Sequence, residues 1–315
     1  MPPTSPLPSL RHCQARRVLH ARASRAISSS WGVSTEDVTI WECPITGLRF
    51  RELSTAPQAI QECYAPDYHE KMTGGSDANR RSRAYRKENE IRVADLERHL
   101  ARGRVLDVGC SRGDFAQAMS RAGFDAHGLD IAPEACSEAR KLLGSERVYC
   151  EPLENLASRM PQQFSAVTLM DVIEHCTDVV TFLGAARQLL EPNGILFLRT
   201  PTLSSPFHVL GTLSYRLSLG LYKTALFKLY HAEHLYFFNE QGMRRLLFEC
   251  GFDTLQVSPD PLCWENFRTA EMRQGPIGNL ALAATYLVGR VFGRGHGMKV
   301  VARRSNTPRN SGGST

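Results

Sequence analysis

The sequence of 315 residues contains no C-x-x-C pair, although it has nine cysteines. An odd number of cysteines without such pairs predicts neither a disulfide framework nor a complete zinc site. Reduced thiols are the simplest interpretation, and we therefore expect a cytoplasmic protein.

Acidic residues are missing from both ends of the chain. Residues 1–35 carry five arginines, and residues 272–315 carry six arginines and one lysine. Removing these +5 and +7 charges from the net +6 leaves residues 36–271 at −6. This acidic centre argues against a nucleic-acid groove, which needs clustered Lys and Arg. We interpret residues 1–35 as a disordered leader, with a transit peptide as the alternative, and residues 305–315 as a disordered tail.

Long apolar runs are also lacking. Residues 277–292 are mostly apolar, but this run is too short, and too interrupted by Asn279 and Arg290, to span a bilayer. Residues 202–232 carry leucines at helical spacing, with basic residues among them. We expect 272–293 to be an apolar helical insertion and 202–232 to be a lid. Peripheral contact with a membrane surface is the alternative for either.

What the sequence does contain is a regular alternation of short apolar runs and helical patterns. Strands are expected over 104–109, 125–130, 147–150, 164–171, 194–201, 252–257 and 298–304, with helices over 114–123, 132–144, 152–160, 178–190 and 239–251. The pattern predicts an α/β fold, a Rossmann-like doubly wound, mostly parallel seven-stranded sheet with helices on both faces. The main domain would span 99–304.

Residues 36–98 precede this domain, and we interpret them as an N-terminal helical extension. Within them, WECPITGLRF (41–50) is similar to the second half of a zinc-knuckle hairpin, but the partner cysteines are absent.

The turn after the first main strand carries the first functional signal, in RVLDVGCSRGDF. Asp107, Gly109 and Gly113 have the spacing D-x-G-x-x-x-G, which is not the G-x-G-x-x-G of dinucleotide sites. Asp107 repels phosphates and suits a cationic ligand. Asp130 ends the second strand, 21 residues after Gly109, where a carboxylate can accept both ribose hydroxyls of an adenosine.

Five stretches together resemble class I S-adenosylmethionine-dependent methyltransferases, nearest to the ubiquinone-biosynthesis O-methyltransferase-like group. They are VLDVGCSRGDF, GLDIAPEA, FSAVTLMDVIEHCTD, LLEPNGILFLRTP and HAEHLYFFNEQGMRRLLFECGF, in family order between about residues 100 and 255. One departure is Ser111, where the family often has a third glycine.

The resemblance implies S-adenosylmethionine as the cofactor. The cofactor-binding residues that it implies are Asp107, Gly109, Cys110, Gly113, Asp130, Ile131, Glu151 and Met170. Asp107 would act on the ammonium group of the methionine, Asp130 on the ribose and Glu151 on the adenine amino group. Met170 and Asp171 would face the methionine moiety.

Methyl transfer to an alcohol or phenol also needs a proton acceptor. The candidate proton acceptors just after the fourth strand are Asp171, which we take as catalytic, Glu174 and His175. They form D-x-x-E-H, similar to the E-x-x-E-H of the ubiquinone group, which resembles a divalent-metal site. Mg²⁺ on these three residues is one interpretation; His175 as a base, or as the residue that orients one, is favoured over it. His231 and His234, in HAEHLYFF, supply a further candidate base, with a structural role for His234 as the alternative.

The sequence therefore predicts a methyltransferase that acts on oxygen of a small-molecule, lipid-linked or glycan acceptor. A nicotinamide-dependent oxidoreductase and a non-catalytic cofactor-binding scaffold are the competing interpretations. The missing middle glycine and the acid at position 107 count against the first of these.

Overall fold

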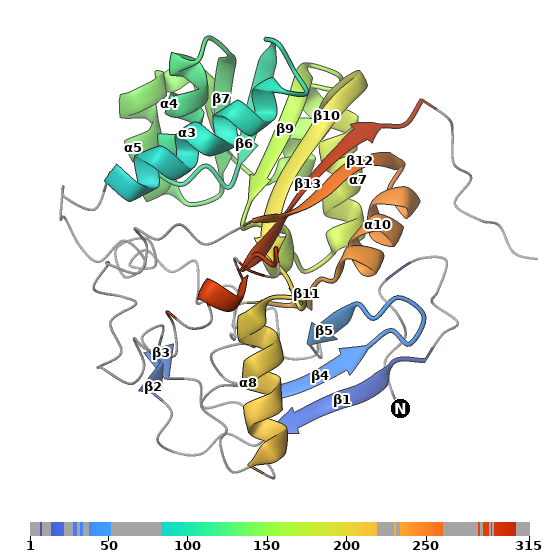
Figure 1. Cartoon of the computed structure of the whole chain (residues 1–315). Coiled ribbons are helices and arrows are strands. Elements are labelled where there is room, and N and C mark those ends of the chain that lie inside the picture. Colours follow the sequence, from blue (N-terminus) through green and yellow to red (C-terminus); the bar gives the residue numbers. More distant parts are fainter. Residues whose placement is uncertain are drawn as a thin grey trace, which may run out of the picture.

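A computed structural model gives the fold (Figure 1), and it describes residues 7, 14–21, 28–29, 32–33, 38–51, 83–218, 230, 234–260, 283, 286–289, 291 and 293–306. A seven-stranded sheet in the order β12-β13-β10-β9-β6-β7-β8 forms the centre of the main domain. Its strands are β6 Arg104–Val108, β7 Asp125–Asp130, β8 Val148–Cys150, β9 Phe164–Met170, β10 Leu190–Pro201, β12 Phe252–Asp260 and β13 Gly297–Arg304. All pairs are parallel except those of β13 with β10 and β12.

Helices cover both faces of this sheet (Figure 1). They are α3 Arg83–Glu97, α4 Asp114–Arg121, α5 Pro133–Leu143, α6 Leu153–Arg159, α7 Val179–Leu189 and α10 Glu240–Glu249. Alternate strand residues point to opposite faces: Leu106 packs in the apolar layer under α6, α7 and α10, and Val105 packs in the layer under α3, α4 and α5. The predicted fold class is confirmed.

A second, antiparallel sheet has the order β1-β4-β5-β11. Its strands are β1 Arg16–Ala21, β4 Val38–Glu42, β5 Arg49–Arg51 and β11 Tyr236–Phe237. A tight hairpin joins β4 to β5, in which the Gly47 amide donates to the Cys43 carbonyl over 2.8 Å. Helix α8, Pro206–Leu217, lies beside this small sheet, whereas the two-residue strands β2 Ser28–Ser29 and β3 Gly32–Val33 pair separately (Figure 1).

The small sheet corrects two expectations about the N-terminal part of the chain. Residues 16–21, expected within a disordered leader, form β1, and the expected helical extension over 36–98 is helical only in α3 among the described residues. The strands β4 and β5 are short, and they are stabilised by partners distant in sequence and by the burial of Ile40 and Phe50. No helix of the described residues is long and apolar enough to cross a membrane.

The expected insertions are only partly described. Helix α8 covers the first half of 202–232, and residues 286–289 are helical within 272–293. Residues 219–229, with their basic side chains, lie outside the described residues. Strand β10 also begins earlier than expected: it runs through the expected EPNG turn, where Asn193 takes a positive φ of 63° and the register to β9 shifts.

Candidate active site

The turn between β6 and α4 depends on two glycines. Gly109 has φ 70°, and a Cβ placed there would lie 2.6 Å from Cγ2 of Val172, just after β9. Gly113 has φ 84° and packs against the backbone of Ala139 in α5. Ser111 also takes a positive φ, 49°, which explains why a glycine suits that position. The missing Cβ of Gly109 thus lets the Val172 side chain pack directly on the turn, at the carboxyl ends of the paired strands β6 and β9.

Asp107 is buried near the carboxyl end of β6, with 3% of its surface exposed. Its Oδ1 accepts a hydrogen bond of 2.7 Å from the Thr168 hydroxyl on β9. Burial raises the pKa of Asp107 to about 7, although the Thr168 hydrogen bond and the positive charge of Arg92 oppose this rise. A cationic ligand beside Asp107 would favour the ionised form.

Asp130 ends β7, and the backbone of the neighbouring turns fixes its carboxylate. Oδ2 accepts from the Ser111 amide over 2.9 Å, and Oδ1 accepts from the Ala132 amide over 3.0 Å. Each oxygen keeps a second lone pair for a ligand hydroxyl. The adjacent Ile131 is half exposed, at 49%.

The remaining predicted cofactor residues occupy different settings. Glu151, after β8, forms an ion pair with Arg159. Cys110 is buried against Gly128, and burial raises the pKa of its thiol well above the usual range. Met170 ends β9 and packs partly against the apolar layer beneath α3, α4 and α5.

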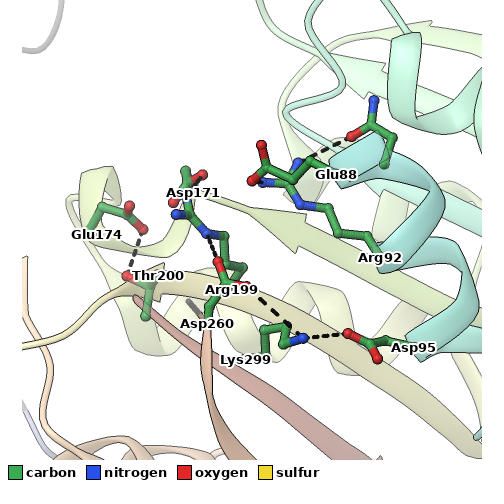
Figure 2. A network of polar contacts seen from close by, with 10 residues as sticks. Glu88, Arg92, Asp95, Asp171, Glu174, Arg199, Thr200, Asp260 and Lys299 are labelled. Carbon is green, nitrogen blue, oxygen red and sulfur yellow. Dashed lines mark hydrogen bonds and ion pairs between the residues drawn. The ribbon is translucent and has the colours of Figure 1, made fainter. Parts of the chain in front are cut away.

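Asp171 follows Met170 and joins a network of charged side chains (Figure 2). Arg199 on β10 forms ion pairs with Asp171 and, through Nε at 2.6 Å, with Asp260 on β12. Lys299 on β13 extends the network to Asp95 on α3. Burial alone would raise the pKa of Asp171, but the nearby positive charges, that of Arg199 first among them, together have the larger effect, so the pKa is lowered. Asp171 is therefore held ionised, in a left-handed backbone conformation with φ 57°.

Glu174, in the short 3₁₀ helix η4 Ile173–His175, is buried with 1% of its surface exposed. Its Oε2 accepts from the Thr200 hydroxyl over 2.9 Å. Burial and the nearby Asp171 charge raise the pKa of Glu174 to about 8. Within the described part of the chain, its Oε1 and the Oδ1 of Asp171 are buried without a hydrogen-bond partner. The Asp171 oxygen thus remains able to accept from a ligand, whereas Oε1 of Glu174 can donate when protonated and accept when ionised.

The structure brings together two of the predicted histidines. The rings of His175 and His234 meet edge to face, with centroids 4.8 Å apart. A backbone hydrogen bond of 2.8 Å from the Leu235 amide to the Glu174 carbonyl fixes this approach. His231 lies outside the described residues.

A divalent metal on Asp171, Glu174 and His175 fits the structure poorly. The potential ligand atoms that come together, within 4.8 Å of one another, belong to Glu174, His175 and His234, whereas Asp171 is paired with Arg199. One carboxyl group with two imidazoles is a poor donor set for Mg²⁺, which prefers oxygen ligands.

The sequence analysis missed Arg92. It lies on α3, 7% exposed, and donates to Glu88 over 2.6 Å (Figure 2). Its charge acts on both Asp107 and Asp171, so it faces the carboxyl ends of β6 and β9. One feature of the sequence could have identified Arg92 as a site residue: it is an arginine at an inward-facing position of the helix that precedes the first main strand.

Comparisons with known proteins identify the family of the chain. A family model described as a methyltransferase domain matches residues 79–257. A ubiquinone biosynthesis O-methyltransferase of Xanthomonas campestris pv. campestris is 41% identical over 105 residues, which are 32% of this chain and 44% of the relative. The chain thus spans less than half the length of the curated relatives it matches.

Two solved structures share the fold at low identity. A SAM-dependent methyltransferase from Archaeoglobus fulgidus has 16% identity and a TM-score of 0.50, covering 74% of this chain and 97% of the other. The 1,6-didemethyltoxoflavin-N1-methyltransferase of Burkholderia thailandensis, solved with 1,6-didemethyltoxoflavin and S-adenosylhomocysteine, has 17% identity and a TM-score of 0.51, covering 85% and 96%. Since the family model covers more than half of the chain, the chain belongs to the methyltransferase-domain family, and the predicted resemblance to class I S-adenosylmethionine-dependent methyltransferases is confirmed.

Proposed function

We propose that the protein transfers the methyl group of S-adenosylmethionine to an oxygen atom of a small-molecule or lipid-linked acceptor. The observation that carries this proposal is the juxtaposition of His175 and His234 just beyond β9, beside the turn where Val172 closes over Gly109. One of these imidazoles would serve as a proton acceptor next to a turn suited to an adenosine-bearing cation. The Xanthomonas relatives, named for O-methylation, support oxygen as the acceptor atom.

The cofactor would lie across the carboxyl ends of β6, β7 and β8. Asp107 would hold its ammonium group, and Arg92, close enough to influence Asp107 and Asp171, would complement its carboxylate. Asp130 would accept the ribose hydroxyls, and Glu151 would contact the adenine. Gly109 and Gly113 would let the backbone approach, with Cys110, Ile131 and Met170 lining the site.

In the transfer step, the carbon–oxygen bond forms as the carbon–sulfur bond breaks, and the bonding pair stays on sulfur. The proton of the acceptor hydroxyl passes to one imidazole of the His175–His234 pair, while the other imidazole orients it. Asp171, held ionised by Arg199, is unsuited to taking that proton at neutral pH. Its unpartnered Oδ1 would instead position the acceptor or the methionine moiety.

The acceptor would approach from the small sheet and α8. Beyond His234, a run of rings continues through Phe237 to His208 and Tyr230, with centroids 4.7 to 6.4 Å apart between neighbours. These rings are buried and form an apolar wall behind His234, which favours an aromatic or apolar acceptor portion, with α8 as the described part of a lid over it. Leu210, Leu213 and Leu217 are exposed on α8, which is consistent with peripheral contact with a membrane surface.

Calorimetric titration with S-adenosylmethionine, S-adenosylhomocysteine and NADH tests the proposal. We expect both sulfur ligands to bind, NADH not to bind, and Asp130→Ala to weaken binding by about ten-fold or more, equivalent to about 1.4 kcal/mol. Asp253→Ala, on the outer strand β12, is the matched control. Binding of NADH alone would favour the oxidoreductase. Normal cofactor binding with no methylated product from a panel of phenols and alcohols would favour the scaffold.

A further inference from the structure

We infer that Cys136 and Cys150 form a redox-responsive dithiol at the adenosine end of the cofactor site, and that their oxidation to a disulfide weakens cofactor binding. This inference rests on the proposed function, because it assigns the adenosine to Asp130 and its neighbourhood. Nothing in the transfer step uses either thiol.

The two cysteines are neighbours between α5 and the ends of β7 and β8. Cys150 is the residue paired with Asp130 in the parallel register of these strands. The Cys136 thiol lies 3.4 Å from the Asp130 carbonyl and 3.8 Å from the carbonyl of Tyr149, the residue before Cys150. Cys150 is also among the groups that raise the pKa of the Cys136 thiol, which agrees with this proximity. Bridging the two cysteines requires the Cys136 side chain to turn from the Asp130 carbonyl toward Cys150.

The two cysteines differ in access, which gives them different roles. Cys150 is exposed and Cys136 is fully buried. Burial, with a contribution from Cys150, raises the pKa of Cys136 to about 12, so Cys136 is a poor first target for an oxidant. Cys150 is therefore the residue that the oxidant modifies first, and Cys136 is the residue that then attacks the oxidised Cys150 to form the disulfide.

The chemistry balances with a hydroperoxide as the oxidant. The Cys150 thiolate attacks the peroxide, the oxygen–oxygen bond breaks, and a sulfenic acid forms with release of water or an alcohol. The Cys136 sulfur then attacks the Cys150 sulfur, and the sulfenic oxygen leaves as water. Two thiols lose two electrons in total, and the peroxide is reduced by the same two.

The disulfide would act on the cofactor through Asp130. Its carboxylate is fixed by the amide of Ala132, whose carbonyl in turn accepts from the Cys136 amide over 3.0 Å. Drawing Cys136 toward Cys150 removes its contact with the Asp130 carbonyl and strains this turn. We therefore expect the ribose site to be distorted while the rest of the sheet stays intact.

Tryptic peptide mapping of the full-length protein detects the Cys136–Cys150 disulfide directly. Cys110, Cys136 and Cys150 fall in three separate peptides, 105–112, 122–140 and 148–159. After treatment with hydrogen peroxide, we expect peptides 122–140 and 148–159 to be linked, and dithiothreitol to separate them. Titration of the same samples with S-adenosylhomocysteine should show affinity about ten-fold lower in the oxidised protein, restored by dithiothreitol.

Variants separate this effect from general oxidation. Cys150→Ser should bind normally and lose its sensitivity to peroxide, and Cys136→Ser should do the same. Cys250→Ser, a matched change at the end of α10, should keep the sensitivity. Linkage of 105–112 to 122–140, no linkage at all, or a linked protein whose affinity stays within about two-fold of the reduced form would overturn the inference. Asp130→Ala in reduced protein tests the adenosine assignment separately, because the mapping needs no cofactor.

Discussion

His175 and His234 lie with their rings 4.8 Å apart, although one follows a strand of the main sheet and the other precedes a strand of the small sheet. The pair is fixed by a backbone hydrogen bond between Leu235 and Glu174. The geometry of the proposed base thus depends on how the two sheets meet.

The first prediction concerns this pair. His175→Ala and His234→Ala should each lower kcat by about 10²-fold or more, because a positioned general base contributes on that scale. Affinity for S-adenosylhomocysteine should change little. His99→Ala, in the turn after α3, is the control and should leave kcat intact. If both site variants keep the full rate, the proton goes elsewhere.

The second prediction concerns pH. Burial raises the pKa of Asp107 from 3.8 to about 7, so the carboxyl group is favoured in its protonated form in the free protein. Its contribution to stability is complete below pH 3.8 and is lost as the pH rises through about 7. Binding of a cationic cofactor needs the ionised form, so affinity should rise with pH up to about 7 and then level off.

Calorimetry across pH 5.5 to 8.5, a range of about three units around the Asp107 pKa, checks this trend. Asp107→Asn should bind the cofactor more weakly and should lose most of the pH dependence. An unchanged slope in this variant would assign the dependence to another group, such as Glu174.

The third prediction concerns Gly109. Gly109→Ala should lower the free energy of unfolding by about 1–2 kcal/mol, because φ is 70° and the new Cβ would meet Val172 at 2.6 Å. Gly184 in α7 is the matched control, since a Cβ there meets nothing within 4 Å. Gly184→Ala should stabilise the protein by about 0.5–1 kcal/mol. Urea denaturation of both variants provides the measurement, and equal effects would contradict the steric argument.

The fourth prediction concerns the charge network of Figure 2. Arg199→Leu would leave the partly exposed carboxylate of Asp171 and the more buried carboxylate of Asp260 without their shared partner, and should cost about 1–3 kcal/mol of stability. Arg244→Ala removes an exposed pair with Glu240 on α10 and should cost less than about 0.5 kcal/mol. Guanidinium unfolding compares the two. Similar losses would mean that the network contributes no more than a surface pair.

The main sheet was predictable because its strands are buried on both faces and alternate with amphipathic helices, so their pattern is local. The small sheet was not, because β5 and β11 are short and acquire their stability from each other across most of the chain. The pairing of Asp171 with Arg199 could not be predicted for the same reason. It depends on the register of β9 and β10, which places Arg199 opposite Met170, the residue before Asp171. Sequence spacing predicted that Asp107 and Asp130 lie near the ligand. It did not predict that both side chains are buried, and it did not identify Arg92 as a neighbour of this site.

The pairing of β11 with β5 also bears on the order of folding. The pairs of β6 with β7 and of β7 with β8 join strands that follow one another, whereas the pair of β5 with β11 has to close a loop that contains β6 to β10, and this closure carries the larger entropic cost. We therefore expect the small sheet to dock last. The segment that carries His234 would then acquire its final position only after the cofactor-binding half has formed, so an incompletely folded chain would hold the cofactor before it could use it.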